Sequence, residues 1–146
     1  MTGLELPVNG LSINLATLRQ QYGFAAAVDA CLAQGITAIA PWRDQVAAIG
    51  LEEAARIVKL NGLRVTGYCR GGMFPATDQA GLDAAIDDNK RAIDEAAALG
   101  ADCLVLVVGG LPGASKDIVA ARGMVADGIA AILPYARAAR DRKSVV

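Results

Sequence analysis

The chain is short, rich in apolar residues and almost neutral. It has 146 residues, of which 54% are hydrophobic and 20% charged, and its 14 basic and 15 acidic residues leave a formal charge of −1. This composition is typical of a soluble, folded α/β protein with one domain over residues 1–146. The weak net charge predicts no nucleic-acid partner. The absence of histidine excludes an imidazole base or metal ligand within this chain.

Three widely spaced cysteines, Cys31, Cys69 and Cys103, form no Cys-x-x-Cys pair. This odd number and wide spacing argue against a disulfide framework and a zinc knuckle, and predict a reducing, cytoplasmic location. The longest apolar run, from Cys103 to Val108, is far shorter than the roughly 20 residues that span a membrane. The N-terminus lacks the pattern of a signal peptide. We therefore expect no membrane partner and no targeting segment.

Alanine-rich helical stretches alternate with short β-branched runs along the chain. Three of the predicted helices are followed by a glycine, Gly35, Gly62 or Gly100, where a left-handed residue ends a helix. The spacing of apolar residues predicts strands at 11–16, 36–41, 63–68 and 103–108, and helices at 24–34, 51–60, 82–99 and about 116–140.

The last of these elements lead to further expectations. The strand at 103–108 is apolar at every position, so we expect it to be covered on both faces. Pro134 is expected to interrupt or kink the final helix. No glycine follows this helix, unlike the earlier ones, and we expect the chain to stop before a fifth strand.

A strand followed by a helix, repeated four times, predicts parallel strands joined by right-handed crossovers. Two architectures fit this order: an open doubly wound sheet and part of a (β/α)₈ TIM barrel. A complete barrel takes about 250 residues, so four units in 146 residues correspond to about half of one. No G-x-G-x-x-G sequence follows the first strand, and the loop at 109–116 lacks Walker spacing. We therefore favour half of a TIM barrel.

In either architecture the functional edge lies at the carboxyl ends of the strands. Two arginines at neighbouring strand ends suit a phosphate, a carboxylate or an enediolate oxygen, because guanidinium is a planar fork of donors. The alternative is that each arginine pairs with a nearby carboxylate such as Asp44. The candidate substrate-binding residues are Asn14 near the first strand end, Trp42 and Arg43 after the second, and Cys69, Arg70 and Gly71 after the third.

Several of these residues leave two interpretations open. Trp42 either forms a wall of a sugar pocket or packs beneath a loop. Gly71 either lets a ligand approach the backbone or simply forms a turn. Cys69 lies beside Arg70, which favours a lower thiol pKa, but without a histidine base we expect a packed side chain rather than a nucleophile. A group of acidic residues is expected on a solvated helix face rather than at a metal: Asp87, Asp88, Asp94 and Glu95.

Four segments of the chain form a recognisable set. They are residues 35–46, which include Pro-Trp-Arg-Asp-Gln, residues 69–74, which begin Cys-Arg-Gly-Gly, and residues 89–100 and 104–110. Together they resemble the sugar phosphate isomerase/epimerase family, the xylose isomerase-like TIM barrels. The resemblance extends from about Leu11 to about Ala139.

The resemblance implies metal-assisted proton transfer next to a sugar carbonyl, with a divalent Mn²⁺ or Mg²⁺ ion holding the enediolate oxygens. In this family the metal ligands and the acid/base residues come from later strands than those present here. We therefore assign no catalytic residue, no metal ligand and no cofactor to this chain. The residues at the early strand ends are expected to contact a sugar or a sugar phosphate.

Two hypotheses follow for the chain itself. It is the N-terminal half of a sugar isomerase or epimerase of carbohydrate metabolism, carrying part of the substrate pocket. Alternatively, it is a catalytically incomplete half-barrel that forms a homodimer through its exposed sheet edges and acts as a structural or ligand-binding module.

Overall fold

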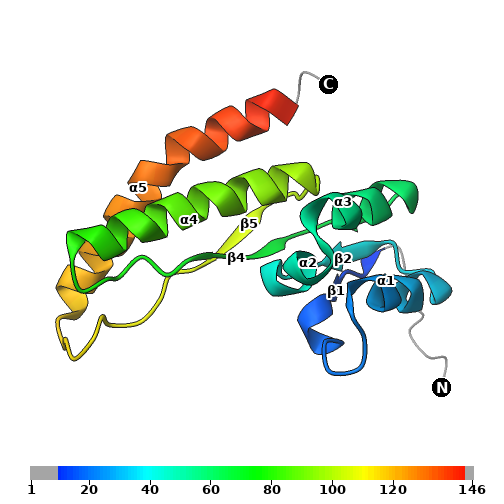
Figure 1. Ribbon diagram of the computed structural model, residues 1–146, viewed down its shortest axis with the longest axis horizontal. Coiled ribbons are helices and arrows are strands. Elements are labelled where there is room, and N and C mark those ends of the chain that lie inside the picture. Colours follow the sequence, from blue (N-terminus) through cyan, green and yellow to red (C-terminus); the bar gives the residue numbers. More distant parts are fainter. Residues whose placement is uncertain (1–9, 144–146) are drawn as a thin grey trace. The chain divides into compact units, whose positions relative to one another are not determined.

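The computed structural model describes residues 10–143 of the chain. These residues divide into two compact units: unit 1 comprises residues 10–69 and 98–103, and unit 2 comprises residues 70–97 and 104–143. The elements run in the order β1 (Ile13–Asn14), η2 (Leu15–Thr17), α1 (Phe24–Ala33), β2 (Ala38–Ala40), α2 (Arg43–Ile49), α3 (Leu51–Leu60), β3 (Arg64–Val65), β4 (Tyr68–Gly72), α4 (Gln79–Ala98), β5 (Leu104–Val107) and α5 (Ile118–Lys143) (Figure 1).

The predicted order of strands and helices is confirmed in its main features. The fold is mixed α/β with parallel strands, and the strands that the structure describes form no closed barrel. Gly35, Gly62 and Gly100 have φ values of 72°, 60° and 70°, as expected for residues that end helices. The expectation of a single domain over residues 1–146 stays a prediction.

Three local features differ from the expectations. The helix α2 was not predicted, because its start depends on a capping contact with Gln45 that apolar spacing does not reveal. The expected strand at 63–68 contains β3 and only the first residue of β4, so Cys69, Arg70 and Gly71, which were expected after this strand, lie within β4. Of the two effects expected at Pro134, an interruption is wrong, because α5 continues through this residue as one helix, and a kink stays a prediction. Proline lacks an N–H group, so the helix loses one hydrogen bond there without ending.

In unit 1, the sheet has the strand order β1-β2-β3 and all pairing is parallel. Ile39 in β2 pairs with Ile13 on one side and with Val65 on the other. Ile39 is 0% exposed and Val65 is 1% exposed, so the middle of this sheet is fully buried. Helix side chains that share this burial are Phe24, Ala27 and Val28 of α1, Val46 of α2, and Ala54 and Val58 of α3.

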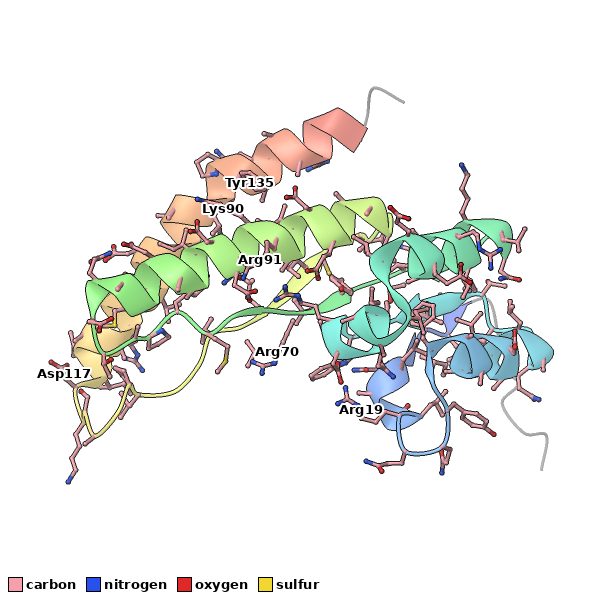
Figure 2. All side chains as sticks on the ribbon, viewed as in Figure 1. Arg19, Arg70, Lys90, Arg91, Asp117 and Tyr135 are labelled. Carbon is pink, nitrogen blue, oxygen red and sulfur yellow. The ribbon has the colours of Figure 1, made fainter. Side chains whose placement is uncertain are left out.

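In unit 2, the strands β4 and β5 pair with each other, and α4 and α5 lie along them (Figure 1). The core of this unit contains Phe74, Ile93 and Ile132, with Leu104 and Leu106 of β5 packed against it. Tyr135 of α5 donates a hydrogen bond to the Asp94 carboxylate of α4 at 2.7 Å (Figure 2). Apolar packing and this polar contact together join the two helices.

One face of β5 is open. Leu104 and Leu106 face the core, whereas Val105 and Val107 on the opposite face are 39% and 43% exposed. The expectation that this strand is covered on both faces is therefore wrong within unit 2. An apolar sequence shows that a strand suits burial, but coverage needs neighbouring elements on both faces.

The helix α5 is long and apolar. By length and composition alone, its segment Ile118–Arg140 is long and apolar enough to cross a membrane. Core helices of water-soluble proteins meet the same criterion, so this finding does not assign α5 to a bilayer. The expected absence of a membrane partner stays a prediction.

Candidate functional site

The carboxyl ends of β1 and β2 bring a tryptophan and an asparagine together in unit 1. The indole Nε1–H of Trp42 donates a hydrogen bond to Oδ1 of Asn14 at 2.8 Å. The same oxygen accepts the backbone N–H of Ala16 at 3.0 Å, because Asn14 is the N-cap of η2. The indole is therefore held in one orientation by a residue that is itself fixed by the backbone.

Arg19, in the loop after η2, completes this group of side chains. Its guanidinium carbon lies 4.9 Å from the centre of the Trp42 ring, within the range of a cation–π interaction. Its Nη1 lies 3.2 Å from a carboxylate oxygen of Asp44, in an ion pair whose side chains are 35% and 61% exposed. A solvent-exposed pair of this kind stabilises by only about 0.2–1 kcal/mol, so another anion can compete for the guanidinium.

The start of α2 is held by a buried amide. The side chain of Gln45 is 9% exposed, and its Nε2 donates to the Leu15 carbonyl at 3.1 Å. Its Oε1 accepts the backbone N–H of Trp42 at 3.3 Å. Gln45 thus connects the backbone after β1 to the backbone after β2, which positions the neighbouring Trp42. Arg43 is half-buried as the first residue of α2.

Cys69 is a packed side chain in unit 1. Its backbone N–H donates to the Pro41 carbonyl at 3.0 Å, and the residue is 8% exposed. Burial raises the pKa of the Cys69 thiol, and the nearby Cys103 raises this pKa further. This is opposite to the direction expected from Arg70, because successive residues of a strand point to opposite faces. The thiol is therefore protonated at neutral pH and is a poor nucleophile.

Arg70 and Gly71 belong to unit 2 and lie on opposite faces of β4. The Arg70 side chain points away from α4 (Figure 2) and is half-buried, with no ion-pair partner among residues 10–140. A Cβ added at Gly71 would lie 2.5 Å from Oδ1 of Asn89 in α4 and 2.9 Å from Leu106. Gly71 is thus required for packing on the α4 side, while Arg70 occupies the other face.

The carboxyl end of β4 is shaped by Asn89, which is 0% exposed. Its Oδ1 accepts the N–H of Gly72 at 2.6 Å, and its Nδ2 donates to the carbonyls of Gly72 and Ala85, both at 2.8 Å. Gly72 has φ 98°, and the next residue, Met73, has φ 58° with its side chain 49% exposed. A non-glycine residue in this region is strained. Asn89 therefore holds an unusual backbone turn at the strand end.

Two residues that contact the strand ends were not predicted from the sequence, Arg19 and Asn89. Arg19 carries no motif, and its contact with Trp42 exists only because the loop after η2 folds back over the indole. Asn89 was noted only within a matched segment, and its partners on β4 are distant in sequence. The only sequence signal for either residue was its type: Arg19 is a basic residue after a strand, and Asn89 is an amide within a helix of mixed apolar and charged residues.

The acidic residues considered above take part in local contacts. Asp87 pairs with Lys90 at 3.1 Å and Asp88 pairs with Arg91 at 3.0 Å, each at i,i+3 spacing along α4. Within the part of the chain that the structure describes, no group of three or more Cys, Asp or Glu side chains could hold a metal ion. The residues present therefore do not fit the divalent ion that the family resemblance implies.

A comparison of the sequence with protein-family models identifies the family of this chain. One model, described as a xylose isomerase-like TIM barrel, matches residues 21–140. The chain therefore belongs to this family, and its α/β fold is a partial TIM barrel, as predicted.

A solved structure gives a more specific comparison. The crystal structure of protein SMc04130 from Sinorhizobium meliloti 1021 is 74% identical in sequence, with a TM-score of 0.90. The match covers 91% of this chain and 48% of that one, so the present chain spans about half the length of this relative. A search of the curated proteins found no match.

The six predicted site residues are distributed over both units. Asn14 and Trp42 are in contact in unit 1, and the backbone of Cys69 pairs with that of Trp42. Arg43 is also in unit 1, whereas Arg70 and Gly71 are in unit 2. Their roles in substrate binding stay predictions.

Proposed function

We propose that this chain supplies the early-strand part of the substrate site of a sugar or sugar phosphate isomerase/epimerase. One observation carries the proposal: in a chain of the xylose isomerase-like family, Asn14, Trp42 and Arg19 meet where β1 and β2 end. TIM-barrel enzymes have their active sites at this end of the strands.

The chemistry of these side chains suits an anionic sugar. The Trp42 ring is kept in place by Asn14 and offers an apolar surface for the C–H groups of a sugar. Arg19 forms its ion pair with the exposed Asp44, and a phosphate oxygen can displace that carboxylate. In unit 2, Arg70 has no ion-pair partner among residues 10–140, so its guanidinium is a separate candidate for binding an anion.

The proposal gives this chain a binding role in the reaction. Proton transfer next to a sugar carbonyl needs a base and an acid within hydrogen-bond reach of the substrate. We assign that task to none of the described residues. The residues of this chain would bind the sugar and orient its anionic group.

Intrinsic fluorescence tests the proposal directly, because Trp42 is the sole tryptophan of the 146-residue sequence. D-fructose 6-phosphate, D-fructose and inorganic phosphate are titrated separately into the full chain. We expect a saturable change with the sugar phosphate, weaker binding of the sugar and of phosphate, and a Kd for sugar phosphate raised about tenfold in Arg19→Ala.

Arg56→Ala is the matched control. Arg56 donates to Glu53 on the exposed surface of α3 at 2.7 Å and lies in no candidate site, so its removal should leave the Kd unchanged. If none of the three probes binds, by fluorescence or by equilibrium dialysis, the proposed binding role is wrong. Equal weakening of binding by Arg19→Ala and Arg56→Ala would mean that the probes respond to net charge only.

A further inference from the structure

The Trp42 ring of unit 1 is covered by an arginine. The Arg19 guanidinium, labelled in Figure 2, lies over the ring with its carbon 4.9 Å from the ring centre. A guanidinium stacked on an aromatic face occupies the surface that the C–H groups of a sugar would contact. A sugar can therefore stack on this face of Trp42 only after the guanidinium has moved away.

Of the two stacked groups, the arginine side chain is the one that can move. The Trp42 indole is fixed by its 2.8 Å hydrogen bond to Asn14, and the Trp42 backbone N–H is held by Gln45 at 3.3 Å. The turn that carries Arg19 is closed by two backbone N–H groups, which both donate to the Leu18 carbonyl at 3.0 Å. The Arg19 side chain is long and 35% exposed, so it can change rotamer while its backbone stays in place.

Asp44 holds the Arg19 guanidinium in this position. Its carboxylate oxygen lies 3.2 Å from Nη1 of Arg19, which is longer than the about 2.7–2.9 Å of a strong charge-assisted hydrogen bond, and the Asp44 side chain is 61% exposed. Exposed ion pairs are weak and are screened by salt. A phosphate monoester carries a charge of about −1.5 to −2 at neutral pH and presents several oxygens to the guanidinium fork. Such an anion competes with Asp44, whereas a neutral sugar does not.

We infer that Arg19 is an anion-operated cover of the Trp42 ring, and that Asp44 keeps this cover closed against uncharged ligands. A phosphate bound to the guanidinium draws it off the indole, and the uncovered face then contacts the apolar part of the same ligand. The anion shifts the cover because it binds the guanidinium better in the open position than in the closed one. Asp44 is thus a positioning residue that sets ligand specificity through Arg19. The inference rests on the proposed function for its ligand, but the cover itself is measured without any sugar.

Acrylamide quenching of Trp42, the sole tryptophan of the sequence, measures how much of the ring is covered. Arg19→Ala should raise the quenching constant of the full chain about twofold, because it uncovers one face of the ring. Asp44→Asn should raise the constant by a smaller factor, since the cation–π contact remains. Inorganic phosphate should raise the constant in the natural sequence but not in Arg19→Ala, and sodium chloride at the same ionic strength should raise it less.

The matched controls are Arg56→Ala and Glu53→Gln, because Arg56 and Glu53 form another exposed ion pair of unit 1, at 2.7 Å on α3. Neither control should change the quenching constant. Circular dichroism checks folding, and Arg19→Lys is a second variant that keeps the charge but lacks the planar fork, so it should lose most of the response to phosphate. An unchanged quenching constant in Arg19→Ala, or a response to phosphate no larger than that to chloride, overturns the inference.

Ligand selectivity separates a cover from a residue that merely supports the fold. Arg19→Ala should lower the Kd for D-fructose about threefold while it raises the Kd for D-fructose 6-phosphate about tenfold, and Asp44→Asn should lower both Kd values. Weaker binding of both ligands by Arg19→Ala would indicate a structural role and overturn the inference. If the quenching results hold and no sugar phosphate binds, the cover is supported and the proposed function is wrong. If sugar phosphate binds and quenching is the same in Arg19→Ala as in the natural sequence, the cover is wrong and the proposed function is supported.

Discussion

The two units differ in how their strands are covered. In unit 1, β2 has a neighbouring strand on each side, and its central residue Ile39 is 0% exposed. In unit 2, β4 is the only described strand that pairs with β5, and alternate residues Val105 and Val107 are 39% and 43% exposed. Both strands are apolar in sequence. The difference shows that burial of a strand depends on the number of neighbouring elements as well as on its own composition.

The units are alike in one respect, since each uses a buried amide to hold the backbone at a strand end. Gln45 makes two such hydrogen bonds in unit 1, at 3.1 and 3.3 Å. Asn89 makes three in unit 2, at 2.6, 2.8 and 2.8 Å, two of them to Gly72. Asn89 in unit 2 therefore makes more and shorter hydrogen bonds than Gln45 in unit 1.

The largest expected effect is on the free energy of unfolding, and it differs between the two buried amides. Asn89→Ala leaves the N–H and carbonyl of Gly72 buried without partners and should lower the free energy of unfolding by about 2–4 kcal/mol. Gln45→Ala removes fewer and longer hydrogen bonds, so it should lower the free energy of unfolding by about 1–2 kcal/mol. Urea unfolding followed by circular dichroism measures both values.

The control for these amides is Asn61→Ala, because Asn61 donates to the Ile57 carbonyl at 2.9 Å on the exposed surface of unit 1. Its removal should cost less than about 1 kcal/mol. If Gln45→Ala costs more than Asn89→Ala, the comparison between the two units is reversed.

A second prediction concerns the packing of unit 2. A Cβ at Gly128 of α5 would collide with the Phe74 ring, so Gly128→Ala should destabilise by about 1–3 kcal/mol. Gly123 lies in the same helix, and a Cβ there meets no heavy atom within 4 Å. Gly123→Ala should therefore stabilise by about 0.5–1 kcal/mol, through helix propensity.

Thermal and urea unfolding of both glycine variants measure whether each substitution raises or lowers the free energy of unfolding. Opposite signs would establish that α5 packs on Phe74 as part of a specific core. Stabilisation by both substitutions would instead show that α5 is held only by its own helix propensity.

The smallest expected effect depends on pH and belongs to unit 1. Burial, with a contribution from Cys103, raises the pKa of the Cys69 thiol above its ordinary value of 9.0 in the folded chain. The folded state therefore retains this proton while the unfolded state loses it. The associated stability is complete below pH 9.0 and declines as the pH rises above that value.

Urea unfolding at neutral and alkaline pH measures this decline, which should be smaller in Cys69→Ala than in the natural sequence. Alkylation offers an independent check at neutral pH. The exposed Cys103 should react first, and the buried Cys31 and Cys69 should react slowly. An early reaction of Cys69 would contradict its assignment as a packed side chain.

Much of the fold could be predicted from local signals. Glycines at 35, 62 and 100 end helices because a residue with positive φ is needed there, and this requirement is local. The helix at Leu51–Leu60 was predicted with the bounds that the structure has. The start of α2 could not be predicted in this way, because the Trp42 N–H is capped by the side chain of Gln45, whose amide also reaches back to Leu15.

The candidate site was predicted less completely than the fold. Trp42 and Asn14 were selected separately as residues at strand ends, and the structure adds the 2.8 Å hydrogen bond between them. Arg19 and Asn89 were missed, because their contacts depend on how a loop and a helix approach a strand. Residue type and spacing do not encode such approaches.

The sequence by itself determined the alternation of helices and strands, the parallel pairing that follows from it, and the family, because these depend on periodicity, glycine positions and short motifs. Only the tertiary structure decided that one face of β5 is open, that Arg19 covers the Trp42 ring and that Asn89 holds the end of β4. The physical reason is that burial and hydrogen bonding are shared between segments distant along the chain, and their free energies exist only when those segments meet.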